Sequence, residues 1–202
     1  MGSAQNLAPV SWSRMLRAVE KVRERLLRAA RALESAGIPY AVVGGHAVAA
    51  HVSRVDEAAV RNTRDVDLLL RRSDLPAARH ALELAGFHYR HLTGLGMPGG
   101  LEAFIDGSDG SIREAVHLVP AGENVRPDSL LASPDVTESE PGDQFRLVTL
   151  PALVRMKLVS FRDKDRTHLR DLLDLGLVDA SWLAQLPDPL AARLRQLIEN
   201  PE

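Results

Sequence analysis

The chain has 202 residues, a formal net charge of −2 and 45% hydrophobic residues, which suits one domain, or one domain with a helical annex. The near-neutral charge argues against a global basic field, so we expect no generic DNA binding. There is no cysteine, which excludes disulfides and cysteine chemistry, and no membrane span or signal peptide is recognisable, so we expect a cytoplasmic protein without a membrane partner.

Hydrophobic periodicity predicts helices and strands along most of the chain. Apolar residues at helical spacing indicate helices, and short apolar or alternating runs between turn residues indicate strands. In chain order the expected elements are a helix over 11–36, a strand over 38–43, a helix over 46–52, a strand over 66–70, a helix over 73–85, strands over 87–92, 101–105, 115–119 and 145–149, a helix over 149–175, and a final helix or helix pair over 182–198.

Three stretches lack such a pattern. Residues 94–100 are rich in glycine and indicate a hairpin or flexible loop, because no clear strand and helix flank them as a phosphate cradle would require. Residues 106–110 are typical of a turn. Residues 120–143 are rich in Pro, Gly, Ser and acidic residues and predict a long connector. The connector fits a boundary, so we expect one domain over 11–145 and a C-terminal helical segment over 146–202 packed on it.

The apolar run that begins at Ala41 ends in two glycines, Gly44 and Gly45, and a helix of small residues follows. Glycines let the backbone approach a ligand closely, and the first turn of a helix offers free N–H groups to an anion. This layout is typical of a phosphate cradle, and His46, the next residue, is placed to meet a phosphate. The simpler interpretation is a tight turn followed by a packing histidine.

Two carboxylates, Asp65 and Asp67, stand in or beside the apolar run that ends at Leu70. Because strand side chains alternate, residues two apart share a face, so both carboxylates are expected to point at one spot. Such a pair can hold a divalent cation, Mg²⁺ or Mn²⁺, whereas in an apolar setting without compensation it would be costly. An Asp-x-Asp on a solvated strand edge is the alternative, but the glycine pair about twenty residues upstream favours a metal and phosphate site.

Basic residues near this stretch are candidates for a triphosphate clamp. Arg61 and Arg64 flank the carboxylates, and guanidinium geometry suits phosphate; the alternative is a solvated charge. In the C-terminal segment, spacings of seven, four and three residues place a second group, which includes two lysines, on a single helical face. It consists of Lys157, Lys164, His168 and Asp171. An exposed, salt-bridged helix face is the alternative there.

Together, Gly44-Gly45, the short helix and the run Thr63-Arg64-Asp65-Val66-Asp67-Leu68 resemble the signature of the nucleotidyltransferase superfamily, the DNA polymerase beta-like fold. Within it the chain is similar to small bacterial nucleotidyltransferases related to abortive-infection toxins. The similarity covers roughly residues 35–120, with a weaker echo at 150–175. It implies an α/β (α+β) fold, a mixed sheet with helices on one side, followed by a C-terminal helical segment.

The resemblance also implies a reaction. A nucleoside monophosphate passes from a nucleoside triphosphate to an acceptor hydroxyl on a small molecule, a protein or an RNA end, with metal ions held by Asp65 and Asp67. The toxin-like relatives suggest a toxin–antitoxin setting with an antitoxin partner. The run from Arg162 to Asp165 resembles the Arg-x-Lys-Asp stretch of these proteins, in which a lysine reaches the triphosphate; Lys157 and Lys164 are the candidates here.

One position departs from the family pattern. A third carboxylate is expected in an apolar strand, and the matching run, 115–119, carries His117 instead. An imidazole can serve as base or metal ligand, but it is a poorer ligand for Mg²⁺ than for Mn²⁺ or Zn²⁺. Glu102 and Asp106 are other candidates for the acid. The departure keeps open a second interpretation, a catalytically inactive nucleotide-binding or interaction module.

Overall fold

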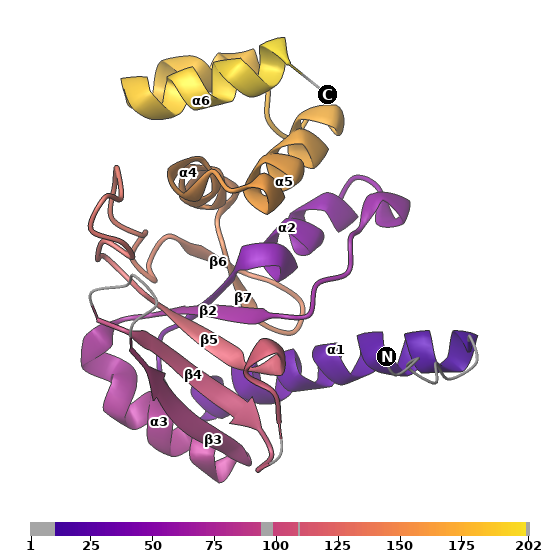
Figure 1. Cartoon of the computed structure of the whole chain (residues 1–202), viewed down its shortest axis with the longest axis vertical. Helices are drawn as coiled ribbons and strands as arrows, with labels where there is room; N and C mark the ends of the chain where they lie inside the picture. The colour runs from indigo at the N-terminus through magenta and orange to yellow at the C-terminus, as the bar shows by residue number, and fades with distance from the viewer. Residues whose placement is uncertain (1–10, 94–98, 109, 201–202) are drawn as a thin grey trace, which may run out of the picture.

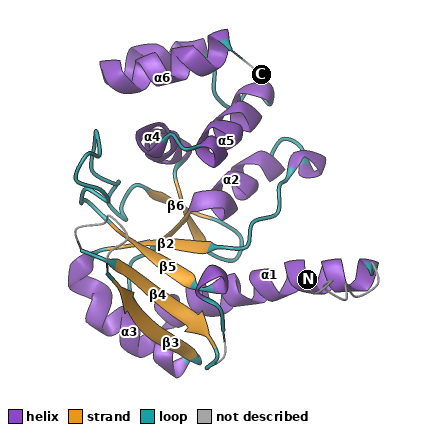
Figure 2. Cartoon of the chain, in the orientation of Figure 1, coloured by secondary structure: helices purple, strands orange, loops and turns teal. Residues whose placement is uncertain are grey.

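The computed structural model describes residues 11–93, 99–108 and 110–200 as a mixed sheet with helices packed against it (Figures 1 and 2). The strands are β1 Ala41–Val43, β2 Val66–Leu70, β3 Phe87–Leu92, β4 Leu101–Asp106, β5 Val116–Pro120, β6 Ser139–Pro141 and β7 Arg146–Val148. In the described residues they form one seven-stranded sheet of order β3-β4-β5-β2-β1-β7-β6. The α-helices are α1 Trp12–Ser35, α2 Gly44–Ser53, α3 Leu75–Leu84, α4 Leu150–Ser160, α5 Asp163–Asp174 and α6 Asp188–Glu199. The predicted α/β fold with flanking helices is thus confirmed.

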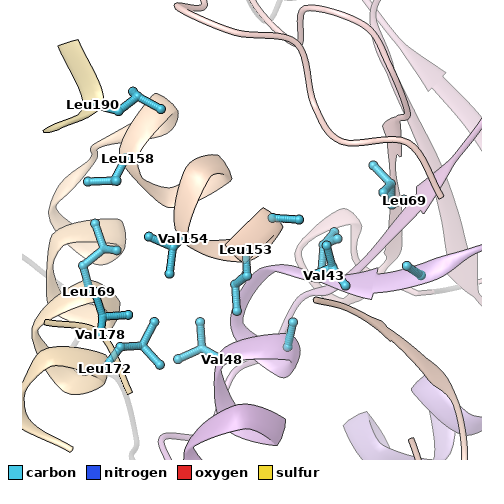
Figure 3. Close-up of a cluster of buried hydrophobic side chains, with 14 of the residues drawn as sticks. Val43, Val48, Leu69, Leu153, Val154, Leu158, Leu169, Leu172, Val178 and Leu190 are labelled. Carbon is cyan, nitrogen blue, oxygen red and sulfur yellow. The ribbon is translucent and has the colours of Figure 1, made fainter. Parts of the chain in front are cut away.

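Helices cover both faces of the sheet, as Figure 1 shows with α1 and α3 below it and α2, α4, α5 and α6 above. Alternation along β1 makes the division plain, because Val42 packs into the cluster with α1 and α3 while Ala41 and Val43 pack into the other cluster. The second cluster, drawn in Figure 3, joins Val43, Val48 and Leu69 to the leucines and valines of the C-terminal helices. The arrangement with helices on one side only, which the resemblance implied, is therefore wrong.

The strands at the centre of the sheet bring three distant segments together. β1 pairs antiparallel with β2, and Val43 lies opposite Asp67. β2 pairs parallel with β5, and Asp67 lies opposite His117. Paired residues in neighbouring strands share a face. Val43, Asp67 and His117 therefore form one row across the α2 face of the sheet, and Gly44 continues directly from that row.

The segment predicted as one helix over 149–175 is two helices. Phe161 ends α4 in the left-handed region (φ 47°), and its ring contacts the guanidinium groups of Arg166 and Arg193. Arg162 then starts α5 through a capping box in which the Asp165 carboxylate accepts from the Arg162 backbone N–H. A left-handed residue breaks the helical path, so Lys157 does not share a helical face with Lys164, His168 and Asp171. The prediction of one shared face is wrong.

The predicted connector over 120–143 contains one strand that the sequence pattern did not reveal. β6 pairs antiparallel with β7 at the edge of the sheet. It is short and holds Pro141, which an edge strand tolerates and which removes the usual strand signal. The loop predicted at 94–100 falls largely outside the described residues. The division at 145/146 stays a prediction, although β7 belongs to the sheet and α4 packs on it.

In the part of the chain that the structure describes, no helix combines the length and the apolar character needed to cross a membrane.

A half-buried histidine of α5, His168, predicts how stability depends on pH. Burial first, and then the charge of Lys157, lowers the pKa of His168 to about 4. The pKa of a histidine in the unfolded chain is near 6.5, so the unfolded chain takes up this proton first as pH falls. The contribution of His168 to the free energy of unfolding should be complete above about pH 6.5 and should fall by about 1–3 kcal/mol toward pH 4.

Urea unfolding at a series of pH values tests this expectation. His168→Gln should flatten the loss of stability between pH 6.5 and 4, and the matched change at the exposed His80 should leave the profile of the wild type unchanged. An identical profile for all three proteins would contradict the assigned protonation of His168.

Candidate active site

The turn from β1 into α2 is shaped around one carboxylate. Gly44 has φ +69°, a left-handed conformation that favours glycine. A Cβ atom at this position would lie 2.1 Å from Oδ2 of Asp67 and 2.9 Å from its Cγ. The Asp67 carboxylate therefore occupies the space that any other residue at position 44 would fill. The first turn of α2 starts directly against an acid that β2 contributes.

The second glycine of the pair also makes a close approach. A Cβ atom on Gly45 would lie 2.8 Å from Oγ1 of Thr63 and 2.9 Å from its Cβ. Thr63 belongs to the segment that leads into β2, so both glycines are packed against the Asp65–Asp67 segment. Thr63 stands within the motif, but its contact with Gly45 joins residues that are distant in sequence, so no local pattern reveals it.

Two imidazoles, of His46 and His117, lie within range of the charges of Asp65 and Asp67. Both carboxylates act to raise the pKa of His46 and of His117. For His46, burial outweighs the carboxylates and the pKa is lowered; for His117, the interaction with the Asp67 carboxylate dominates and the pKa is raised. That these four side chains meet at one cleft stays a prediction, because of the four only His46 lines the main cavity.

His117 is fixed on both sides of its ring. Its Nε2 lies 3.1 Å from the carbonyl oxygen of Ile112, and its Nδ1 lies 3.6 Å from Oδ1 of Asp67. Because a carbonyl only accepts, Nε2 carries a hydrogen and donates it to Ile112. Nδ1 is then the nitrogen that faces the carboxylate. Metal-binding histidines commonly show this arrangement, with one nitrogen donating to a backbone carbonyl and the other directed at the site.

The other candidates for a third acid lie on the opposite face. Ala103 pairs with His117, so Glu102 and Asp106 alternate with it and share the side of Phe104, which packs into the α1 and α3 cluster. Glu102 accepts hydrogen bonds from Tyr89 and bonds to His91, and Asp106 pairs with Arg25 and Arg28. These acids are engaged elsewhere, so neither completes the Asp65–Asp67 pair. Among the described residues, no three His, Cys, Asp or Glu side chains form a metal-binding cluster, so the expected set of three ligands, Asp65, Asp67 and His117, is not assembled.

Lys157 approaches the site from α4 as a buried cation. Only 7% of its side chain is exposed, and its Nζ donates to Oδ1 of Asp165 at 3.0 Å. Burial lowers the pKa of Lys157, and the charges of Asp165 and Asp67 oppose that effect. Burial would raise the pKa of Asp165, but Lys157 and Arg162 bring it down to about 2. The pair is therefore ionised, with Lys157 near enough to Asp67 to sense its charge.

The three remaining basic candidates, Arg61, Arg64 and Lys164, differ in whether they are already paired with a carboxylate. Arg61 forms a bidentate ion pair with Asp171 of α5, at 2.7 and 2.9 Å, which ties the segment before β2 to the C-terminal helices. Arg64 is exposed and has no ion-pair partner among the described residues. Lys164 is exposed at the start of α5 and acts on the pKa values of both Lys157 and His168. Arg64 and Lys164 are the cations free to meet an added anion, whereas Arg61 would first have to leave Asp171.

Asp165 is the polar residue of this region that sequence reasoning left without a role. It is buried and accepts from Lys157 and from the backbone and side chain of Arg162. A capping box needs an acid three residues after the cap, so the Arg162–Asp165 spacing is the signal that would have marked both the helix break and the partner of Lys157.

Comparisons with known proteins agree with this geometry. A search of curated proteins found no match. Among solved structures, the chain resembles a candidate nucleotidyltransferase from H. pylori, at 15% identity and a TM-score of 0.50, over 95% of this chain and 79% of that one. It also resembles ANT(2″)-Ia, which was crystallised with adenylyl-2″-tobramycin, at 17% identity and a TM-score of 0.50, over 91% of this chain and 99% of that one. At these identities the likeness shows the fold alone.

A family profile extends the likeness to the sequence. The family described as "uncharacterised nucleotidyltransferase" matches residues 11–115, just over half of the chain, including the glycine pair and both aspartates. This match confirms the predicted superfamily and the expectation of an enzyme, while the narrower similarity to abortive-infection toxins stays a prediction. The chain belongs to this nucleotidyltransferase family.

Proposed function

We propose that the chain transfers a nucleoside monophosphate from a nucleoside triphosphate to a hydroxyl, with a divalent metal held at Asp65 and Asp67. The observation that carries the proposal is the position of the Asp67 carboxylate beside Gly44, where a Cβ atom would lie only 2.1 Å from Oδ2. A phosphate at the first turn of α2 would lie beside that carboxylate. A metal ion between the phosphate and the Asp67 carboxylate would compensate both negative charges.

Several groups support binding of the triphosphate. The first backbone N–H groups of α2 have no partners within the helix, and Gly44 and Gly45 have no side chains that would shield them. Lys157 supplies a buried cation close to Asp67, and Lys164 and Arg64 supply exposed cations at the rim. We assign the β- and γ-phosphates to these cations and the α-phosphate to the vicinity of the carboxylates.

The donor set fits a Mg²⁺ or Mn²⁺ ion shared with a substrate. Mg²⁺ is commonly bound by one or two carboxylates together with water and substrate phosphates, so two aspartates suffice when the nucleotide provides further oxygens. Such an ion would neutralise the triphosphate and acidify the attacking hydroxyl. Nδ1 of His117 lies at the edge of this set, where it can pair with Asp67 or become a ligand in its place.

The chain's residues then account for each part of the transfer. The acceptor oxygen forms a bond to the α-phosphorus as the bond from that phosphorus to the bridging oxygen breaks, and pyrophosphate leaves toward Lys157 and Lys164. The α2 N–H groups and the lysines hold the departing negative charge. The hydroxyl proton passes to a base beside Asp65 and Asp67. The candidates for this base are the imidazoles of His46 and His117, in their neutral form.

His117 favours a second candidate function, a nucleotide-binding module without turnover. It replaces the expected third carboxylate, and when protonated it neutralises Asp67 instead of adding a negative charge. The module and the enzyme share the nucleotide site and differ only in product formation. Turnover of labelled nucleoside triphosphates, measured after binding has been established, separates the two.

Gly44→Ala tests the cradle. The added methyl group would collide with Asp67 and would occupy a left-handed backbone position, so we expect a loss of about 1–3 kcal/mol of stability. We also expect at least tenfold weaker binding of nucleoside triphosphate in the presence of Mn²⁺. Urea unfolding and calorimetric titration measure the two effects.

Gly37→Ala is the matched control. Gly37 also has a left-handed φ, +66°, but a Cβ atom there would have nothing within 4 Å. It should lose stability through its backbone alone and bind nucleotide as the wild type does. Equal nucleotide affinity for both variants would remove the cradle from the proposal.

Replacements at the acidic row test the metal site. His117→Asp should strengthen Mg²⁺ binding and raise any Mg²⁺-supported turnover, because a third carboxylate adds an oxygen ligand and a negative charge. Asp67→Ala should abolish metal binding with either residue at position 117, and Asp128→Asn, at an exposed loop position, should change nothing. Calorimetric metal titration with and without nucleoside triphosphate gives these affinities. Unchanged affinity across the whole set would leave the proposal without its metal.

A further inference from the structure

A cavity of about 620 Å³ lies on the side of α2 that faces away from the C-terminal helices. α2 presents two faces: Ala47, Val48 and Val52 pack into the cluster with α4 and α5, while His46, Ala50 and Ser53 line the cavity. α1, β7 and the segments around 60–63 and 142–145 complete the walls. Volumes of 300–1,000 Å³ are typical of pockets for small molecules.

The cavity and the carboxylate site meet at His46. This residue lines the cavity, and both Asp65 and Asp67 act on its imidazole. Its Nε2 is buried and has no hydrogen-bond partner among the described residues. Buried polar atoms are normally paired, so an orphaned nitrogen between a cavity and a reactive site indicates a partner that arrives with a ligand. Thr63, which packs against Gly45, is a second wall residue next to the Asp65 segment.

The charges of the walls argue against a polyanionic occupant. The arginines that reach the cavity are already paired, Arg23 with Glu20, Arg54 with Glu140 and Arg61 with Asp171. None of the cations assigned to phosphate lines the cavity: Lys157 and Lys164 stand on the C-terminal helices, on the other side of α2, and Arg64 is not among the wall residues. Phosphate binding and the cavity are therefore separated, with α2 between them.

Apolar side chains mark the mouth of the cavity. Val19 of α1 and Val60 line it although they are 42% and 36% exposed, and Val22, Leu26 and Leu27 continue the apolar wall inward. Such walls favour a ligand with an apolar body, and His46, Asn62 and Thr63 give its polar end hydrogen-bond partners.

We propose that this cavity binds the acceptor, a small molecule with an apolar body and a hydroxyl that contacts Nε2 of His46. This inference rests on the proposed function and deepens it, because it selects a small-molecule acceptor over a protein or an RNA end. The hydroxyl oxygen bonds to the α-phosphorus of the nucleoside triphosphate, the bond to the bridging oxygen breaks, pyrophosphate leaves, and the hydroxyl proton passes to Nε2 of His46 in its Nδ1-protonated form. His46 thus moves from the phosphate role predicted from sequence to a role toward the acceptor.

The experiment uses the intact chain with Mn²⁺ and α-labelled nucleoside triphosphates. A metabolite extract of the producing cells, their total RNA and their total protein are offered separately as acceptors. The label should appear in the metabolite fraction. Label on RNA or on protein would overturn the inference and leave the proposed transfer intact, whereas no transfer to any fraction would remove the proposed function and this inference with it.

Substitutions that fill the cavity provide a second test, which concerns the location of the acceptor. Ala50→Phe deep in the cavity and Ser53→Trp at its exposed rim should each reduce labelling of the metabolite fraction at least tenfold, with Mn²⁺–nucleotide affinity unchanged. Ala77→Phe, on the exposed surface of α3, is the matched control and should label as the wild type does. Circular dichroism identifies a misfolded variant; if Ala50→Phe does not fold, Ser53→Trp decides. Undiminished labelling by the folded cavity variants would overturn the location.

His46→Ala separates the two roles of this histidine. A role toward the acceptor predicts a large loss of labelling with nucleotide affinity unchanged, whereas a loss of nucleotide affinity would return His46 to the phosphate side and overturn its contact with the acceptor.

Discussion

The close approach of Asp67 to Gly44 is the constraint on which the site depends. Side chains normally separate a strand from the turn that leads into a helix. Here the Asp67 carboxylate occupies the space that a Cβ atom at position 44 would fill. The contact lies where Val43 pairs with Asp67 and where Gly44 turns left-handed into α2, and it brings an anion to the end of a helix that attracts anions. The carboxylate competes with phosphate for those N–H groups unless a cation lies between them, which is why we assign a metal to this position.

Charges are divided across α2 in a way that suits a two-substrate reaction. On one side, Lys157 is kept ionised in a buried position by Asp165, and the break at Phe161 is what brings that acid within reach. A buried cation with one close partner costs desolvation, so its retention beside Asp67 favours a functional use. On the other side, every arginine at the cavity is neutralised by a carboxylate, and apolar residues of α1 complete the wall. The proposed donor and acceptor sites differ in polarity for this reason.

Sequence reasoning located the centre of the sheet better than its surroundings. Strand alternation placed Asp67 and His117 on one face because the face of a strand side chain follows from a local two-residue period, and the glycine pair marked the turn. The same local rules failed where tertiary contacts decide. The helical spacing from Lys157 to Asp171 looked continuous because Phe161 has no intrinsic left-handed preference, β6 was hidden by Pro141, and the pairing of Arg61 with Asp171 joins residues 110 positions apart. The cavity, built from four separate segments, had no sequence signal.

A crystal structure of the chain with Mn²⁺ and a non-hydrolysable nucleoside triphosphate would test the central claim most directly. Anomalous scattering locates the metal independently of the nucleotide. The account predicts a manganese peak between the carboxylates of Asp65 and Asp67 and a phosphate of the nucleotide, with that phosphate at the first turn of α2 and the triphosphate extending toward Lys157. A nucleotide bound in the cavity between α1 and α2, or a metal away from both aspartates, would contradict it.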